Sequence, residues 1–137
     1  MAFWLLKSEP NAWSWQQQVD AGTTHWDGVR NHQASGHLKA MQVGDQAFFY
    51  HSGEERRIVG IVEIVRPYYL DANDPPDRFG MVDVRTVAAM PEPVTLAAIK
   101  ADPRLRHLTL VRQSRLSVTS IDAEAWELLT SMGGFGK

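Results

Sequence analysis

The run Ile58–Val65 constrains the fold most, because it is apolar on both faces of an extended chain. A strand of that kind lies in the middle of a sheet with both faces covered. Its neighbours along the chain are also strand-like. Gln46–His51 is rich in aromatic residues, and Met81–Val87 alternates apolar and charged positions. A turn at Gly53-Glu54 reverses the chain between the first two strands. The core of this protein is therefore predicted to be a β-sheet.

The remaining elements are short and of mixed type. Strands are expected at Phe3–Lys7 and Leu116–Ser120, and helices at Trp15–Ala21, from about Asn31 to Met41, at Thr95–Ala101 and at Ala123–Met132. Arg66 to Phe79 contains three prolines and three aspartates and is expected to form one long loop. Five or so strands interleaved with short helices in 137 residues predict one compact α+β barrel domain over residues 1–137.

The segment from Trp26 to Ala34 is the most informative one for function. It combines a large aromatic ring, an acid, a glycine, a guanidinium group and amides. Gly28 lets the backbone turn where a side chain would block it. Trp26 offers a flat apolar face, and Asp27, Arg30 and Asn31 offer directional donors and acceptors. These features suit one wall of a pocket for a nucleobase, although a tryptophan before a tight turn is often only a core anchor.

Composition excludes several classes of protein. Hydrophobic content of 44% and charged content of 22% are ordinary for a soluble globular chain. A net charge of −2 argues against a nonspecific nucleic-acid coat, so any contact with a polyanion must be one-sided. The apolar run after Met1 is too short for a signal peptide or a membrane span. The chain has no cysteine, which leaves no disulfide or thiolate metal site and favours a cytoplasmic location.

Four segments that mix polar and aromatic residues stand at strand ends or turns. They are Lys7-Ser8-Glu9-Pro10, Trp26 to Asn31, Phe48-Phe49-Tyr50-His51-Ser52 and Arg112-Gln113-Ser114-Arg115-Leu116-Ser117. In this order, together with Gly44-Asp45 and Met81-Val82-Asp83-Val84, they closely resemble the EVE domain. The resemblance extends from Ala2 to Gly134, and the WDGVRN and VRQSRLSV blocks are its most specific parts.

The resemblance implies a PUA-like pseudo-barrel of about five to six strands with short flanking helices, related to the ASCH and YTH domains. Such domains are regarded as binding modules for modified nucleobases, chiefly 5-methylcytosine and its relatives in DNA, with RNA also a candidate partner. It implies a protein that is not an enzyme, with no cofactor, no metal and no membrane partner. A monomer is favoured.

The residues fit that role. Trp26 would stack on a base that has left its duplex, and Tyr50 and Phe79 would supply a second wall. The edge of the base would be recognised by polar side chains, for which the candidates are Ser8, Glu9, Asn31, His51, Gln113 and Ser114. Phosphates beside the pocket would be held by Lys7, Arg30, Arg112 and Arg115.

Each assignment has a structural alternative. Phe48 and Phe49 are expected mostly in the core, Lys7 and Glu9 could form an ordinary surface pair, and Arg115 could tie the last strand to the barrel. Where the family usually has an aromatic pair before Met-Val-Asp, this chain has Arg78-Phe79-Gly80, so that wall of the pocket is expected to be thinner.

The competing class is an ASCH-like amidohydrolase or nuclease, in which Lys7, Ser8 and Glu9 would act as nucleophile, base and acid. Because the three are consecutive, alternate side chains on an extended chain point in opposite directions. The five histidines show no metal-ligand spacing, and the zinc deaminase signature is absent. A purely structural interaction module is a third class, but it would leave the polar segments unexplained.

Overall fold

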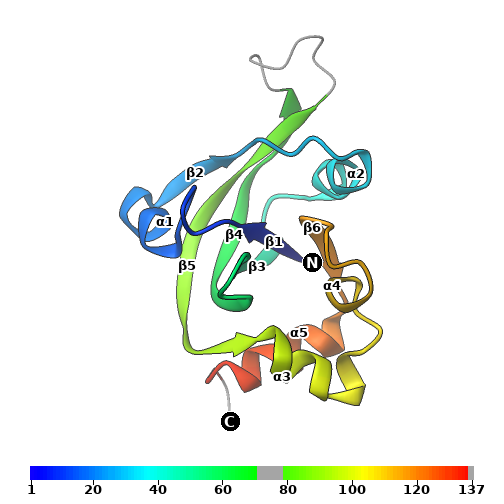
Figure 1. Cartoon of the computed structure of the whole chain (residues 1–137). Coiled ribbons are helices and arrows are strands. Elements are labelled where there is room, and N and C mark those ends of the chain that lie inside the picture. The colour runs from blue at the N-terminus through cyan, green and yellow to red at the C-terminus, as the bar shows by residue number, and fades with distance from the viewer. Residues whose placement is uncertain (71–78, 136–137) are drawn as a thin grey trace.

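The computed structural model of this chain describes residues 1–70 and 79–135. Its strands are β1 (Phe3–Ser8), β2 (Thr23–Trp26), β3 (Gln46–His51), β4 (Arg57–Leu70), β5 (Gly80–Thr95) and β6 (Val118–Ile121). Its helices are α1 (Trp15–Ala21), α2 (His32–Ala40), α3 (Leu96–Ala101), α4 (Thr109–Arg112) and α5 (Ala123–Met132), with a 3₁₀ turn, η1 (Pro103–Leu105). Figure 1 shows a curved sheet with α2 at one end and α3 to α5 at the other.

The sheet places β4 at its centre, as its two-sided apolar pattern predicts. The strand order is β2-β5-β4-β3-β1-β6. β1 and β3 are parallel, and the other neighbours are antiparallel. Ile58, Val62 and Ile64 of β4 are fully buried. The predicted α+β class with five to six strands and short flanking helices is confirmed.

The prediction of a long loop from Arg66 to Phe79 is wrong for its first five residues, because β4 continues to Leu70. Tyr69 pairs with Met81 of β5. Pro67, which suggested a loop, falls where the register shifts between Arg66 and Tyr69. Proline lacks a backbone N–H and is tolerated at such a bulge. Residues 71–78 lie outside the described part of the chain.

Other boundaries also differ from the sequence-based ones. β2 was not predicted: it is a four-residue strand on β5, short enough to escape a search for alternation. β5 runs past Val87 to Thr95, whose side chain caps α3. β6 covers Val118–Ile121 rather than Leu116–Ser120. The helix that Asn31 and Met41 cap was placed correctly, and so were α1 and α5.

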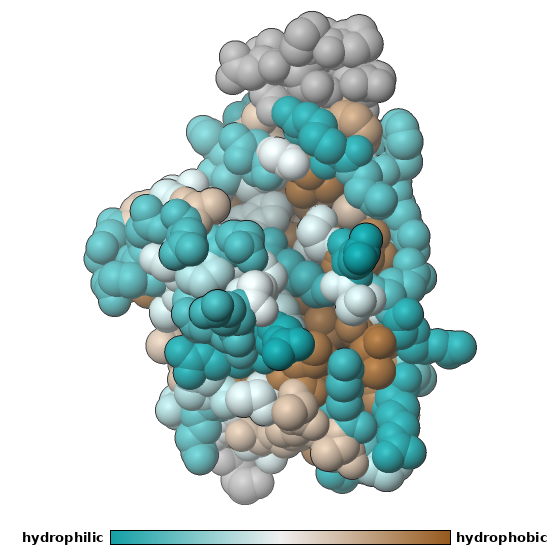
Figure 2. Space-filling model, viewed as in Figure 1, coloured by the Kyte–Doolittle hydropathy of each residue, from teal (hydrophilic) through white to brown (hydrophobic). Residues whose placement is uncertain are grey.

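Alternation along the strands divides the buried side chains into two clusters, one on each face of the sheet. Leu6 and Phe49 belong to the cluster under α2, together with Trp26. Leu5 and Phe48 belong to the other, under α5. Both phenylalanines are fully buried, as expected. Figure 2 shows hydrophobic side chains gathered in the middle and lower part of one face, surrounded by polar ones.

Candidate functional site

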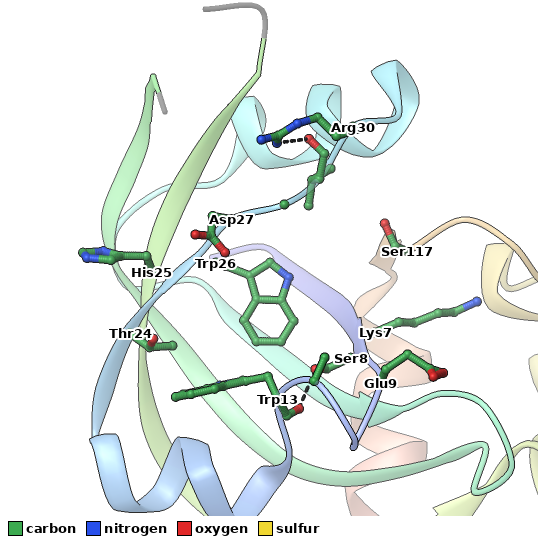
Figure 3. A pocket seen from close by; sticks show the side chains of 13 residues that line it. Lys7, Ser8, Glu9, Trp13, Thr24, His25, Trp26, Asp27, Arg30 and Ser117 are labelled. Atoms are coloured by element: carbon green, nitrogen blue, oxygen red, sulfur yellow. Dashed lines mark hydrogen bonds between the residues drawn. The ribbon is translucent and has the colours of Figure 1, made fainter. Parts of the chain in front are cut away.

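A cavity of about 560 Å³ opens where β1 and β2 end (Figure 3). Three segments meet there: the end of β1 with the turn after it, the end of β2 with the turn before α2, and the residue that directly precedes β6. The lining residues are Lys7, Ser8, Glu9, Ala12, Trp13, Thr24, His25, Trp26, Asp27, Gly28, Val29, Arg30 and Ser117.

The turn after β2 brings its side chains to the cavity through a glycine in the left-handed region. Gly28 has φ +77°, and an added Cβ there would meet no atom within 4 Å. Glycine is therefore required here by the backbone conformation and not by a lack of space for a side chain. Asn31 then caps α2, its Oδ1 accepting the Ala34 N–H at 2.9 Å. The Asn31 side chain therefore caps α2 and does not line the cavity. Asp27 is exposed and does line it.

The turn after β1 holds a second tryptophan at the cavity. Ser8 Oγ donates to the Trp13 carbonyl at 2.5 Å, and the Trp13 N–H donates to the Glu9 carbonyl at 2.9 Å. The Trp13 indole N–H donates to Oε1 of the fully buried Gln18 at 2.9 Å. Trp13 is only half-buried. Hydrogen bonds therefore hold both the backbone and the indole nitrogen of Trp13, while part of the ring surface faces the cavity.

Trp26 is both a core residue and a wall of the cavity. It is 7% exposed, and its ring meets Phe49 edge-on, with centroids 5.4 Å apart and planes at 86°. The two sequence interpretations of Trp26, core anchor and pocket wall, therefore both describe it.

Lys7 lies at one rim of the cavity. Its Nζ donates to the Ser114 carbonyl at 2.7 Å and lies 5.7 Å from the centre of the Tyr50 ring. Burial lowers the pKa of Lys7 below the usual value for lysine. Beyond Ser114 lies a second hollow of about 300 Å³, lined by Asn31, Gln33, Gln113, Ser114, Arg115 and Leu116.

The opposite rim carries a linked polar cluster. His25 Nδ1 and the Tyr69 hydroxyl both contact Asp83 Oδ1, at 2.9 and 2.6 Å. Burial, with the bond to Asp83, raises the pKa of Tyr69 to about 12. Burial would raise the pKa of Asp83, but its bonds to His25 and Tyr69 outweigh this and lower it. The Arg66 guanidinium lies 3.6 Å from the centre of the Tyr69 ring, which places a cation beside the Asp83 carboxylate at this rim.

The structure distributes the predicted site residues over three places. The cavity contains Lys7, Ser8, Glu9, Trp26 and Arg30. The second hollow contains Asn31, Gln113, Ser114 and Arg115, and Arg112 is exposed at the end of α4. Tyr50, His51 and Phe79 do not line the cavity.

Those three residues have other surroundings. Tyr50 is buried in the cluster under α5, on the face of the sheet away from Phe49. His51 Nε2 accepts the Trp15 N–H at 2.9 Å and its Nδ1 contacts Glu55 at 2.8 Å, so both ring nitrogens have structural roles. Phe79 packs against His32, with ring centres 4.9 Å apart, and under Arg30. The expected second wall from Tyr50 and Phe79 is replaced by Trp13.

Sequence reasoning missed four lining residues with polar or aromatic side chains: Trp13, Thr24, His25 and Ser117. Asp27 lines the cavity as the interpretation of the WDGVRN block as a pocket wall predicts, although it was not one of the named candidates for contact with the base. Trp13 follows the KSEP segment closely, and a second tryptophan beside a predicted turn was the signal available for it.

The described residues contain no group of three histidine, aspartate or glutamate side chains that could hold a metal ion. Within the same residues no helix is long and apolar enough to cross a membrane. Each of the three residues considered for catalysis forms a hydrogen bond to a group outside the set. Ser8 donates to Trp13, Lys7 to Ser114, and Glu9 accepts a bond from Ser52.

Comparison with known proteins gives a consistent result. The family model described as the EVE domain matches residues 2–132. Thymocyte nuclear protein 1 of Gallus gallus is 35% identical over 164 residues, which cover 94% of this chain and 67% of the relative. An NMR structure of a Rhodopseudomonas palustris protein is 50% identical, with a TM-score of 0.95, and covers 100% of this chain and 96% of its own.

A further solved structure carries a ligand. Human THYN1, crystallised in complex with DNA that contains 5-methylcytosine, is 30% identical to this chain. The two superpose with a TM-score of 0.90 and cover each other fully.

Proposed function

This chain belongs to the EVE domain family, and we propose that it binds nucleic acid by taking a modified base into the cavity between Trp13 and Trp26. The modified base that we favour is of the 5-methylcytosine type, because the crystallised chain of human THYN1 shares this fold throughout and was crystallised with DNA containing that base. DNA is the favoured partner, with RNA an alternative, and the protein would act as a monomer. The cytoplasmic location expected from the sequence stays a prediction.

The observation that carries the proposal is the cavity itself. Small-molecule sites are usually concave, largely apolar and 300–1,000 Å³ in volume, with a few polar groups that fix orientation. This cavity of about 560 Å³ has two indole rings and the buried Val29, and eight of its lining side chains are polar or charged. Figure 3 shows Trp26 in its middle, with Trp13 below it and Ser8 and Ser117 to its right. A single flat heterocycle with a polar edge matches that combination.

The polar groups suit the edge of a cytosine. A carboxylate accepts a hydrogen bond from the exocyclic amino group of cytosine, as Asp and Glu do in sequence recognition. Asp27 is exposed on the wall of the cavity and would supply that acceptor. Val29 would provide the apolar surface for the 5-methyl group. A base in this position has left its stack, as in enzymes that act on extruded bases.

Cationic side chains stand where the backbone of the extruded nucleotide would pass. Lys7 and Arg30 line the cavity, and Arg115 lines the adjoining hollow. Contacts of this kind position a nucleic acid without recognising its sequence. A hydrolytic role is favoured less, since Ser8 already donates its hydroxyl proton to the Trp13 carbonyl, and Lys7 and Glu9 are bonded elsewhere.

We expect a shallow dependence of affinity on salt. Each neutralised phosphate contributes about −0.9 to the slope of log affinity against log salt on duplex DNA, and about −0.7 on single strands. Two to four contacts from Lys7, Arg30, Arg112 and Arg115 then give a slope of roughly −1.5 to −3.5. Titration of a fluorescent oligonucleotide at several salt concentrations measures it.

Arg112→Ala should flatten that slope by nearly one unit and weaken modified and unmodified strands alike. Arg104→Ala is the matched control, because the Arg104 guanidinium is paired with Asp102 at 2.7 Å, whereas Arg112 directly precedes Gln113 of the second hollow. It should leave the slope unchanged. A slope steeper than about −6 would require a long electrostatic track and would contradict a single cavity with a small phosphate clamp.

A further inference from the structure

The indole nitrogen of Trp26 is a hydrogen-bond donor that opens to the cavity, and it is not one of the unpartnered polar atoms that are shut off from solvent among the described residues. Trp26 is 7% exposed, and no hydrogen bond joins its Nε1 to another group among residues 1–70 and 79–135. Figure 3 shows the nitrogen-bearing edge of the ring directed toward the open space between Arg30, Ser117 and Lys7. An N–H group at the wall of a cavity with no protein partner is available to a ligand, because it can exchange a hydrogen bond to water for one to an acceptor on the ligand.

The other cavity tryptophan is arranged in the opposite way. The indole N–H of Trp13 already donates to Oε1 of Gln18 at 2.9 Å, so only the ring surface of Trp13 is available to a ligand. The Trp26 ring packs edge-on against Phe49, which leaves little of the ring surface uncovered. Its indole N–H, by contrast, has no hydrogen-bond partner in the part of the chain that the structure describes.

We infer that the two tryptophans divide the work: Trp13 is the stacking platform for the bound base, and Trp26 donates a hydrogen bond through Nε1 to an acceptor on it. The inference rests on the proposed function. It adds that the ligand must present a carbonyl oxygen or an unprotonated ring nitrogen to Trp26. A cytosine-type base carries both kinds of acceptor on its pairing edge, beside the amino group assigned to Asp27.

The test is a titration of the ¹⁵N-labelled protein with a short oligonucleotide that contains one 5-methylcytosine, followed through the indole N–H signals. The chain has five tryptophans and therefore five such signals. Trp26→Phe and Trp13→Phe assign two of them by loss of a peak. At saturation the Trp26 signal should move downfield and exchange more slowly with water. The Trp13 signal should keep its protection, because its bond to Gln18 remains.

The possible failures are distinguishable. If the oligonucleotide binds and other cavity signals move while the Trp26 N–H signal stays in place, the donor role is wrong and the proposed function stands. If no signal moves at any oligonucleotide concentration, with modified or unmodified bases, the proposed function and this inference both fail.

A substitution gives an independent measure. Trp26→Phe keeps an aromatic ring against Phe49 but removes the N–H, and should weaken binding of the 5-methylcytosine oligonucleotide about ten-fold. Trp15→Phe is the matched control, since Trp15 also meets Phe49 edge-on, at 5.3 Å, yet does not line the cavity. It should bind as the unaltered protein does. Equal affinity of the Trp26→Phe variant, in a protein of unchanged melting temperature, would overturn the inference.

Discussion

Replacing Trp26 with alanine is expected to lower the free energy of unfolding by about 3–5 kcal/mol, the usual cost of truncating a large buried aromatic residue. The ring is 7% exposed, belongs to the cluster under α2 and packs on the fully buried Phe49. Alanine would leave a cavity in that cluster, because neighbours anchored in the sheet can close it only in part. Denaturant unfolding measures the change.

The same experiment on Trp26→Phe should show a much smaller loss, since most of the ring volume is kept. A loss below about 1 kcal/mol for the alanine variant would mean that the ring is not packed as the structure has it. Because the alanine variant combines a stability effect with a binding effect, it cannot define the role of Trp26 in recognition, and the phenylalanine variant is needed for that purpose.

Replacing Trp13 with alanine should produce the largest loss of affinity for a comparatively small loss of stability. Stacking of a base on an aromatic side chain is worth about 1–3 kcal/mol, which is roughly 5- to 150-fold in affinity. Trp13 is half-buried and sits in a turn that Ser8 and Glu9 hold through its backbone, so the turn should survive the substitution. Fluorescence anisotropy with a 5-methylcytosine oligonucleotide measures the loss.

Trp13→Phe provides the control for that prediction. Phenylalanine keeps a flat ring but loses the bond to Gln18, so most of the affinity should return. Retention of full affinity by the alanine variant would show that the base does not rest on Trp13. The Trp13→Ala melting curve is recorded in parallel, so that a folding defect is not taken for a binding defect.

Much of this architecture could be predicted from residue patterns because those patterns reflect burial. The two-sided apolar run of β4 could only suit a central strand, and Ser14, Asn31 and Asp122 cap the helices they precede. The end of β4 could not be predicted, since Pro67 indicates a break unless the partner strand is known to accommodate a bulge.

The membership of the site was harder to predict than the fold. Tyr50 and Phe49 are adjacent in β3, and the sequence shows that they face opposite ways but not which face carries the cavity. His51 and Asn31 are polar residues near the site whose groups serve backbone amides of Trp15 and Ala34. Trp13 reaches the cavity through the turn that Ser8 and Glu9 organise, a contact that no local pattern reveals.

The central claim, that the cavity takes a modified base, is tested most directly by comparing paired oligonucleotides. Affinities are measured at one fixed salt concentration for strands that differ only in one base, across a panel of cytosine and adenine modifications. One methyl group in an apolar pocket is worth about 1–3 kcal/mol, so we expect a preference of tens- to a few hundredfold for the 5-methylcytosine strand over its unmodified twin. Equal affinity across the whole panel would contradict the claim.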